Sequence, residues 1–181
     1  MSDADADWRD RLDHDRAQKD EYFADHPQSP LPRTERDSFD GLSYYAPDER
    51  YRFVLPLHEF DERETVSVGT TTEGEREYLR WGAFRFDLDG EERSLTAYRA
   101  DPNEDRLWVP FTDETNGETT YGGGRYLDLD ADDRRGDGTW LLDFNAAYNP
   151  FCVYSDAYEC ALVPFENRLD VRIEAGERVD Y

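Results

Sequence analysis

Lysine is almost missing from this chain: Lys19 is the only one among the 21 basic residues, and all the others are arginines. Acidic residues number 44, which gives a formal net charge of −23. In dilute buffer this charge would destabilise the folded chain by self-repulsion, but at 1 M salt the screening length is only about 3 Å. The composition therefore predicts a halophilic protein with an acidic surface, from a cytoplasm of molar salt. An acidic protein of an ordinary cytoplasm is the alternative.

The chain also lacks a basic stripe and a long apolar run. Its arginines are scattered among Asp and Glu residues, whereas phosphate binding needs clustered cations and is weakened by molar salt. We therefore expect no nucleic-acid partner and no binding to an anionic membrane. No apolar run approaches the roughly 18 residues of a membrane-spanning helix. The acidic start, residues 1–5, does not resemble a secretory signal, so the expected location is the cytoplasm.

Cysteine is scarce, since Cys152 and Cys160 are the only two. A disulfide between them would close a short loop and stabilise the fold by about 2.5 kcal/mol, but a reducing cytoplasm favours separate thiols. Reactive thiols and metal ligation are further alternatives. The chain contains no HExxH, HxH, GxSxG or Walker motif, so we predict no metal site and can name no cofactor.

Aromatic residues, in contrast, are plentiful: 12 Tyr, 10 Phe and 4 Trp. A disordered acidic segment would not carry so many large apolar side chains. A chain of 181 residues can bury roughly 70% of its unfolded surface, so it needs no disulfide to hold a core. We expect one globular unit in two parts, an N-terminal helical segment with its linker (residues 1–41) and a β-rich domain (residues 42–181).

The first of these parts is predicted to open with a helix over residues 5–25. The helix must end before Pro27, because a proline disfavours helical geometry at the residue before it. Thr34, with Asp37 three residues later, predicts the cap of a short helical turn. One face of the long helix combines the Lys19 stem with apolar side chains, namely Trp8, Leu12, Tyr22 and Phe23.

The second part shows the period-two patterns of β-strands. Residues 80–88 and 91–100 flank Asp89-Gly90, a pair that suits a type I′ turn, and together they predict a hairpin. Further strands are predicted at residues 51–56, 65–72, 106–111, 125–129, 139–144 and 169–173. This spacing predicts an α+β fold of mostly antiparallel strands, as a partly closed barrel or a sandwich with the N-terminal helix packed on it.

One stretch, residues 121–168, differs from the charged remainder in its amides, tyrosines and glycines. Such uncharged groups orient small ligands in cavities, so we predict a barrel pocket that binds a small polar or anionic molecule. Arg125 would supply charge and paired hydrogen bonds, and Asp143 would hold Arg125 or a tyrosine hydroxyl. The other predicted ligand-binding residues are three amides that orient the ligand and three flat aromatic walls: Asn145, Asn149, Asn167, Tyr126, Tyr148 and Tyr154.

The same stretch also suits structural, catalytic or assembly roles. Glycines 122–124 suit a tight turn as well as an anion-binding backbone beside Arg125, and asparagines readily cap turns. An enzyme, for example a hydrolase, could use the same pocket with Asp143 or Glu166 as general base, which requires a shielded carboxylate of raised pKa. A non-catalytic assembly protein would instead expose these aromatic residues on a flat patch.

Several strings together resemble the domain of unknown function 1684 family, in a haloarchaeal form. They are HPQSPL (residues 26–31), FDGLSYYAPDERYRF (39–53), ETTYGGGRYLDL (118–129), DFNAAYNPFCVYSDAYEC (143–160) and PFENRL (164–169). The resemblance runs over nearly the whole chain and implies a shared fold and a shared site, with no activity attached. Ala146 departs from it, because the resemblance leads us to expect an arginine there, and there is less proline than expected at residues 162–165.

Overall fold

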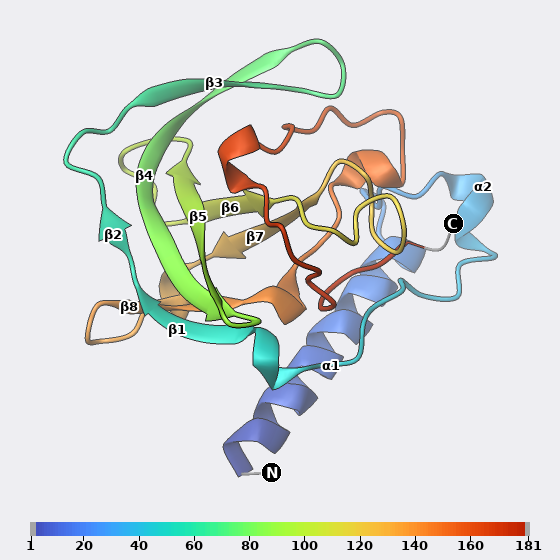
Figure 1. Cartoon of the computed structure of the whole chain (residues 1–181). Helices are drawn as coiled ribbons and strands as arrows, with labels where there is room; N and C mark the ends of the chain where they lie inside the picture. Colours follow the sequence, from blue (N-terminus) through green and yellow to red (C-terminus); the bar gives the residue numbers. More distant parts are fainter. Residues whose placement is uncertain (1–2, 180–181) are drawn as a thin grey trace.

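The computed structural model describes residues 3–179 and the side chains from residue 6 onward. The chain opens with helix α1 (Asp3–Asp25) and a single turn, α2 (Arg33–Arg36), and the rest consists of strands, short 3-10 turns and irregular segments (Figure 1). The long helix expected from the sequence is thus confirmed, with its first turn two residues earlier. None of the helices in residues 3–179 is long and apolar enough to cross a membrane.

The strands form two antiparallel sheets. One has two strands, β1 (Arg52–Pro56) and β8 (Thr139–Asp143). The other has the order β2-β4-β5-β6-β7, with β3 paired to a second part of β4. Its strands are β2 (His58–Glu59), β3 (Thr65–Gly69), β4 (Glu75–Leu88), β5 (Glu91–Arg99), β6 (Leu107–Phe111) and β7 (Arg125–Leu129).

The hairpin predicted around Asp89-Gly90 is confirmed. Leu88 of β4 pairs with Glu91 of β5, and the two residues between them have φ of +53° and +80°. A type I′ turn needs positive φ at both central positions, which asparagine, aspartate and glycine tolerate best. The short turn therefore sets the register of the two longest strands.

The α+β class dominated by antiparallel strands is confirmed as well. Within the described part of the chain, however, the two sheets do not join into a closed barrel. The barrel or sandwich expected from strand spacing is therefore not confirmed.

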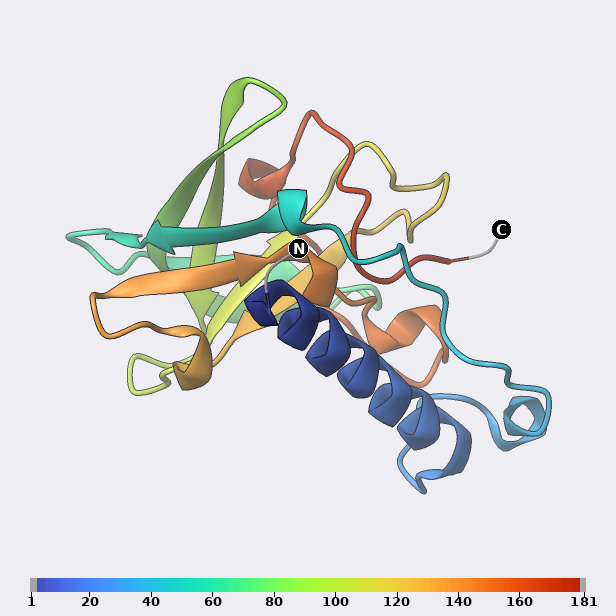
Figure 2. The same cartoon turned by 90° about the horizontal axis from the view of Figure 1, so that it is seen from below.

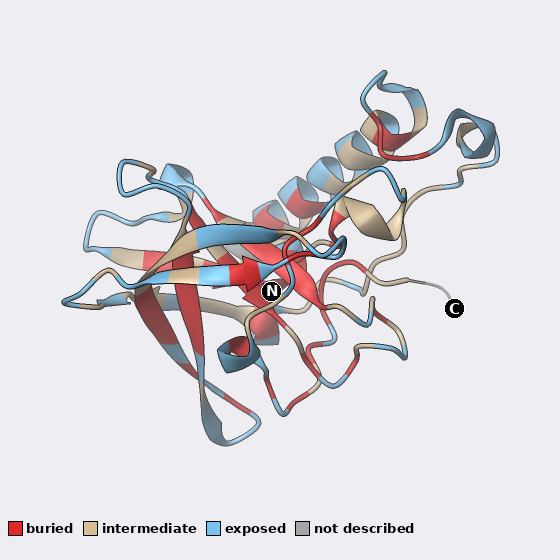
Figure 3. Ribbon diagram, turned by 90° about the horizontal axis from the view of Figure 1, so that it is seen from above, coloured by how far each residue is buried: buried red, intermediate tan, exposed pale blue. Residues whose placement is uncertain are grey.

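The hydrophobic core lies between the two sheets. Alternate residues of β6 and β7 point into it, among them Leu107, Val109 and Leu127, and they meet Trp140 and Leu142 of β8. This is the period-two burial expected of strands with one face on the core. Figure 3 shows the buried residues gathered on the strands, with exposed residues on the outer side of α1 and in the loops.

The opposite face of the larger sheet carries the residues that alternate with the core set. This face carries Trp108 of β6 and Tyr126 and Asp128 of β7. The chain after β8 returns across it. A bridge between Tyr126 and Tyr148 holds this returning segment against the edge of β7. Around β6 and β7 the sheet is therefore covered on both faces, by the core on one and by residues 148–161 on the other, whereas Arg85 and Asp87 of β4 are exposed.

Helix α1 runs along one side of the strands, past the end of the β1–β8 pair (Figures 1 and 2). The apolar face expected for this helix packs against the rest of the fold, because Trp8, Leu12 and Phe23 are buried. The indole Nε1 of Trp8 donates to Asp143 Oδ2 at 2.9 Å, which fixes the helix to the end of β8.

Two predictions about local structure are wrong. Helix α2 begins at Arg33 after Pro32, without a side-chain cap, so Thr34 lies inside the turn and does not start it. Residues 169–173 form no strand, although Leu169 and Ile173 are buried as the alternation implied. The Ile173 N–H donates to the Asp113 carboxylate at 2.7 Å and not to a neighbouring strand, because the segment crosses the sheet as an irregular chain.

Candidate functional site

A pocket of about 380 Å³ lies on the second face of the larger sheet, under the returning segment. Strands β4, β6 and β7 form its base and residues 148–161 form its opposite wall. We call it the aromatic pocket, and its lining includes Tyr78, Trp108, Tyr126, Tyr148, Phe151 and Tyr158.

Four of these rings form a connected wall. Tyr78 stacks on Trp108 with 4.5 Å between ring centroids and 24° between planes. Trp108 then meets Tyr126 edge to face at 5.2 Å, and Tyr126 meets Tyr148 in the same way at 5.8 Å. Stacked and edge-to-face contacts at these distances are the favourable geometries for aromatic pairs. The wall is therefore rigid and presents flat surfaces.

Charged groups surround the rings. The lining contains two guanidiniums and three carboxylates, those of Arg76, Arg106, Glu104, Asp128 and Glu159. Asp128 accepts from both Arg106 and the Tyr148 hydroxyl. Burial alone would lower the pKa of Arg106, but the Asp128 carboxylate raises it, so the guanidinium stays charged.

The hydroxyls of two pocket tyrosines, Tyr126 and Tyr148, have raised pKa values and are neutral. Burial raises the pKa of Tyr126, whose hydroxyl donates to the Ala161 carbonyl, and this bond ties the sheet to the covering segment. Burial and the Asp128 carboxylate raise the pKa of Tyr148. These groups can donate or accept hydrogen bonds at a ligand, but at neutral pH they do not act as phenolates.

Arg125 lies elsewhere, fully buried in the core between β7 and the C-terminal segment. Its terminal nitrogens donate to the backbone carbonyls of Ile173, at 2.8 Å, and of Ala175 and Glu177. Its carboxylate partner is Asp113, at 3.4 Å, and not Asp143. The guanidinium that was expected to meet an anionic ligand thus holds together a chain segment that forms no strand.

The three asparagines also serve the backbone. Asn167 accepts from the Thr96 N–H and donates to the Thr96 and Pro110 carbonyls, each at 2.8 Å, so it replaces a missing strand partner. Asn145 exchanges two hydrogen bonds of 2.9 Å with the backbone of Asp48. The Asn149 side chain donates to the Arg178 carbonyl at 3.3 Å and to the Tyr154 hydroxyl at 3.0 Å. All three side chains are at most 1% exposed.

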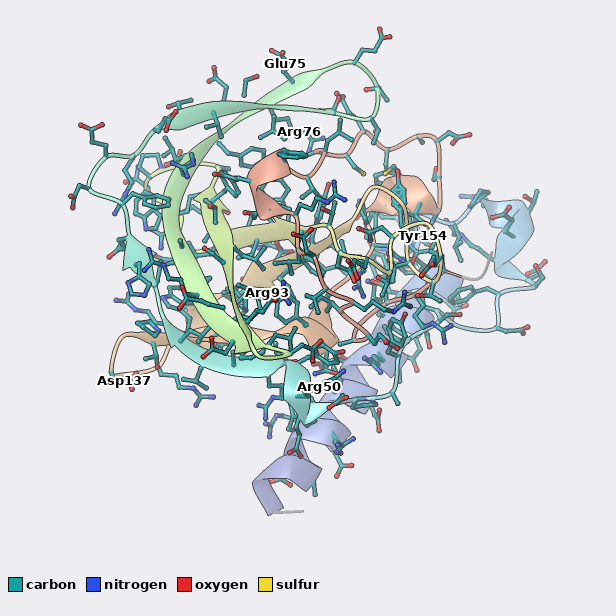
Figure 4. All side chains as sticks on the ribbon, viewed as in Figure 1. Arg50, Glu75, Arg76, Arg93, Asp137 and Tyr154 are labelled. Carbon is teal, nitrogen blue, oxygen red and sulfur yellow. The ribbon has the colours of Figure 1, made fainter. Side chains whose placement is uncertain are left out.

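Tyr154 lies beside α1, away from Arg76 at the pocket (Figure 4). Its ring meets Phe23 edge to face at 5.0 Å, and its hydroxyl donates to the buried carboxylate of Glu177 at 2.8 Å. Of the eight residues predicted to bind a ligand, the structure therefore brings two, Tyr126 and Tyr148, to the aromatic pocket. The other six hold turns, segments or α1 in place.

The glycine triplet and the cysteines have local structural roles. Gly124 has φ of +96°, and a Cβ there would lie 2.6 Å from the Phe111 carbonyl, which agrees with the tight-turn interpretation. Cys152 and Cys160 are free thiols in contact, since the Cys152 N–H donates to Cys160 Sγ at 3.3 Å. Burial and the hydrogen bond to Cys160 raise the pKa of Cys152 to about 11, so it is a neutral thiol near pH 7.

Neither carboxylate considered as a general base has the required environment. Asp143 accepts from Trp8 and from the Asn145 N–H and side chain, and Arg52 lies 3.5 Å away. For Glu166, burial opposes ionisation, but hydrogen bonds from Arg80 and Tyr98 lower its pKa. Among the described residues, no group of three or more His, Cys, Asp or Glu side chains is placed to hold a metal ion.

Three important residues of the pocket were not singled out from the sequence: Tyr78, Trp108 and Asp128. The signal for two of them was present, because period-two alternation puts Trp108 opposite the core residues of β6 and puts Asp128 on the same face as Tyr126. Tyr78 could not be found this way, since a register shift between Arg80 and Gly82 interrupts the alternation of β4.

Comparison with known proteins gives a family and a similar structure. The model of the family described as "Protein of unknown function (DUF1684)" matches residues 37–178. The solution NMR structure of an uncharacterised protein from Haloarcula marismortui is 44% identical and superposes with a TM-score of 0.76. The match covers 99% of this chain and 98% of that one. No curated protein sequence matches the chain significantly.

Proposed function

The chain belongs to the DUF1684 family of unknown function, and from the geometry of its larger sheet we propose that it binds a small molecule in the aromatic pocket. The observation that carries this proposal is a cavity of about 380 Å³ between a sheet and a covering segment, lined by a connected group of aromatic rings. Ligand sites in proteins are concave, mostly apolar and lined by a few well-placed polar groups.

The pocket fits a ligand with a flat or apolar body and a polar end. Rings that contact one another cannot collapse into the cavity, because Tyr78, Trp108 and Tyr126 already support each other. The carboxylate of Glu104 at the rim is available to orient the ligand, because it accepts only the Ala100 N–H among the described residues. The aromatic residues line a cavity and not a flat patch, which favours a binding function over an assembly function.

The proposed ligand differs from the one expected from the sequence in one respect. An anionic ligand was expected because Arg125 was predicted to bind it, and that guanidinium is buried among carbonyls. The charges that line the aromatic pocket are three carboxylates and two guanidiniums. This lining does not favour an anionic ligand, but it suits a small polar molecule.

We also propose that the protein works in a cytoplasm of molar salt. Support comes from the net charge of −23 with a single lysine. The 44% identity to a Haloarcula protein along nearly the whole chain supports it too. Binding in the aromatic pocket is compatible with such salt, because burial of apolar surface is not screened as surface charge is.

A fragment screen by ligand-observed NMR in molar KCl tests the proposed function. Ala100 is exposed at the end of β5 and lines the pocket, so Ala100→Phe would fill the cavity without disturbing the core. We expect small aromatic or amphipathic fragments to bind the natural chain and to lose at least about tenfold in affinity, near 1.4 kcal/mol, in Ala100→Phe.

The matched control is Ala146→Phe, which adds the same ring at an exposed position outside the aromatic pocket. It should leave binding unchanged. Fragments that bind Ala100→Phe as well as the natural chain, or the absence of any fragment that binds the natural chain, would contradict the proposal.

A further inference from the structure

The rings of the aromatic pocket lack the arginine cover that is common elsewhere in the molecule. An arginine guanidinium lies 4.0 Å from the ring centroid of Trp81, 4.5 Å from that of Trp8 and 5.9 Å from that of Trp140. Within residues 3–179, Trp108 is the one tryptophan without a basic side chain over its ring. In a chain rich in arginine, Trp108 thus has aromatic neighbours, Tyr78 and Tyr126, but no cation of the described chain over its ring.

Three of the four tyrosines in the lining also lack a basic side chain over the ring, whereas Lys19 lies 5.1 Å from the ring centroid of Tyr148. Among the described residues, no arginine or lysine lies over Tyr78, Tyr126 or Tyr158. The face of an aromatic ring carries negative charge density and attracts a cation within about 6 Å, most strongly when the ring is tryptophan. Several such faces in one cavity are the usual arrangement for binding methylated ammonium groups.

The charges at the rim have the sign that a cation needs. Three carboxylates against two guanidiniums give the lining a formal charge of −1. Arg106 is already paired with Asp128, and Arg76 donates to the Glu159 backbone carbonyl at 2.6 Å. Glu104 accepts only a backbone N–H, that of Ala100 at 3.2 Å, and has no ion pair within the described part of the chain.

From these observations we infer that the ligand of the aromatic pocket is an organic cation, held by the rings of Tyr78, Trp108 and Tyr126 and by the carboxylate of Glu104. The inference rests on the proposed function, because it names the charge of the ligand for the same pocket. Molar K⁺ does not replace such a ligand, since K⁺ is more strongly hydrated than a methylated ammonium ion and has no apolar groups to contact the aromatic wall. A methylated or planar cation loses less hydration and gains both dispersion and cation–π energy.

Three molecules of nearly equal shape and different charge test the inference: choline, its neutral analogue 3,3-dimethylbutan-1-ol, and the anion 3,3-dimethylbutanoate. Their dissociation constants are measured by protein-observed NMR in molar KCl. We expect choline to bind about tenfold more tightly than the neutral analogue, and the anion to bind most weakly. The chemical-shift changes should be largest at Trp108 and Tyr126.

Variants then distinguish the contribution of the Trp108 ring to choline binding from that of the Glu104 carboxylate. Trp108→Leu should abolish the preference for choline, whereas Trp81→Leu, at a ring already covered by Arg63 and Arg99, should keep it. Glu104→Gln preserves the hydrogen bond to Ala100 and is on the surface, so it should fold normally and weaken choline alone by about two- to fivefold.

Each other outcome overturns the inference. Equal or tighter binding of the neutral analogue or of the anion would show that the pocket selects shape or negative charge, while the proposed function would stand. If none of the three binds, the inference fails, and the fragment screen with Ala100→Phe decides the proposed function separately.

Discussion

At the scale of single residues, the buried guanidinium of Arg125 is the most informative group. The side chains of both Arg125 and Asp113 are 0% exposed, and their closest atoms are 3.4 Å apart. Around them residues 173–177 form no strand, although Glu177 bridges to Tyr44, and the guanidinium donates to the carbonyls of Ile173, Ala175 and Glu177. This buried ion pair fixes the course of the backbone at residues 173–177. Breaking it leaves the Asp113 carboxylate and several backbone carbonyls without their partners.

We therefore expect Arg125→Met to lower the free energy of unfolding by about 3–5 kcal/mol, the usual cost of leaving a buried charge unpaired. Urea unfolding in molar KCl, followed by tryptophan fluorescence, measures this loss. The matched control is Arg168→Met, because the exposed Arg168 has only a 4.0 Å ion pair with Asp170, worth less than about 1 kcal/mol. Equal losses in the two variants would contradict a structural role for Arg125.

Single residues also explain why only some of the side chains predicted to bind a ligand meet at the aromatic pocket. The sequence indicates that the amides and tyrosines of residues 121–168 are unusual. It does not distinguish an asparagine that binds a ligand from one whose side chain hydrogen-bonds to the backbone. Asn167 joins β5 and β6 to the C-terminal segment. These partners are about 60 to 70 residues away, and no local pattern reports such contacts.

At the scale of elements, α1 is attached through a small number of specific contacts. The chain's only lysine, Lys19, forms one of them, with its ammonium 2.7 Å from the carboxylate of Glu177. Glu177 is 1% exposed and also accepts from Tyr154 and from the Asn149 N–H. The flexible lysine stem reaches across Phe23 and Tyr148, where its ammonium lies 5.7 and 5.1 Å from the ring centroids.

Lys19→Met should therefore weaken the docking of α1, with a loss of about 1–3 kcal/mol in the free energy of unfolding. Arg11→Met, at an exposed position of the same helix, should change it by less than about 0.5 kcal/mol. Adding Glu177→Gln to Lys19→Met should recover part of the loss, because the buried charge is removed with its partner. Strictly additive effects in this double-mutant cycle would show that the pair is not coupled.

The elements differ in how far their local sequence determines them. Asp89-Gly90 is sufficient to predict the hairpin, because the turn has conformational requirements that few residues meet. Residues 169–173 have the alternation of a strand and bury the expected side chains, but only Leu169 and Val171 bond to a neighbouring backbone among the described residues, and the partners of Ile173 are the Asp113 and Arg125 side chains. Period-two burial reports which side chains face the core, whereas a strand also needs a neighbouring backbone, and that depends on the whole fold.

At the scale of the whole molecule, charge decides stability. Most ion pairs of the structure involve side chains that are substantially exposed, such as Arg172–Glu118 at 39% and 63%, and such pairs contribute little and are screened by salt. The pairs made by Arg125 and Lys19 are shielded from solvent and keep their strength. Salt therefore removes few attractions, while it relieves the repulsion of a net charge of −23.

The melting temperature should consequently rise with KCl, and the fold should melt partly or fully below about half-molar salt. Circular dichroism during heating, at a series of KCl concentrations, measures this dependence. A variant with four exposed acids neutralised, Asp61→Asn, Glu62→Gln, Glu75→Gln and Glu77→Gln, should remain folded at lower salt, because less repulsion has to be screened. If salt acted only by strengthening apolar burial, the natural chain and this variant would need the same KCl concentration, and a sharp melt of the natural chain in dilute buffer would contradict the halophilic assignment itself.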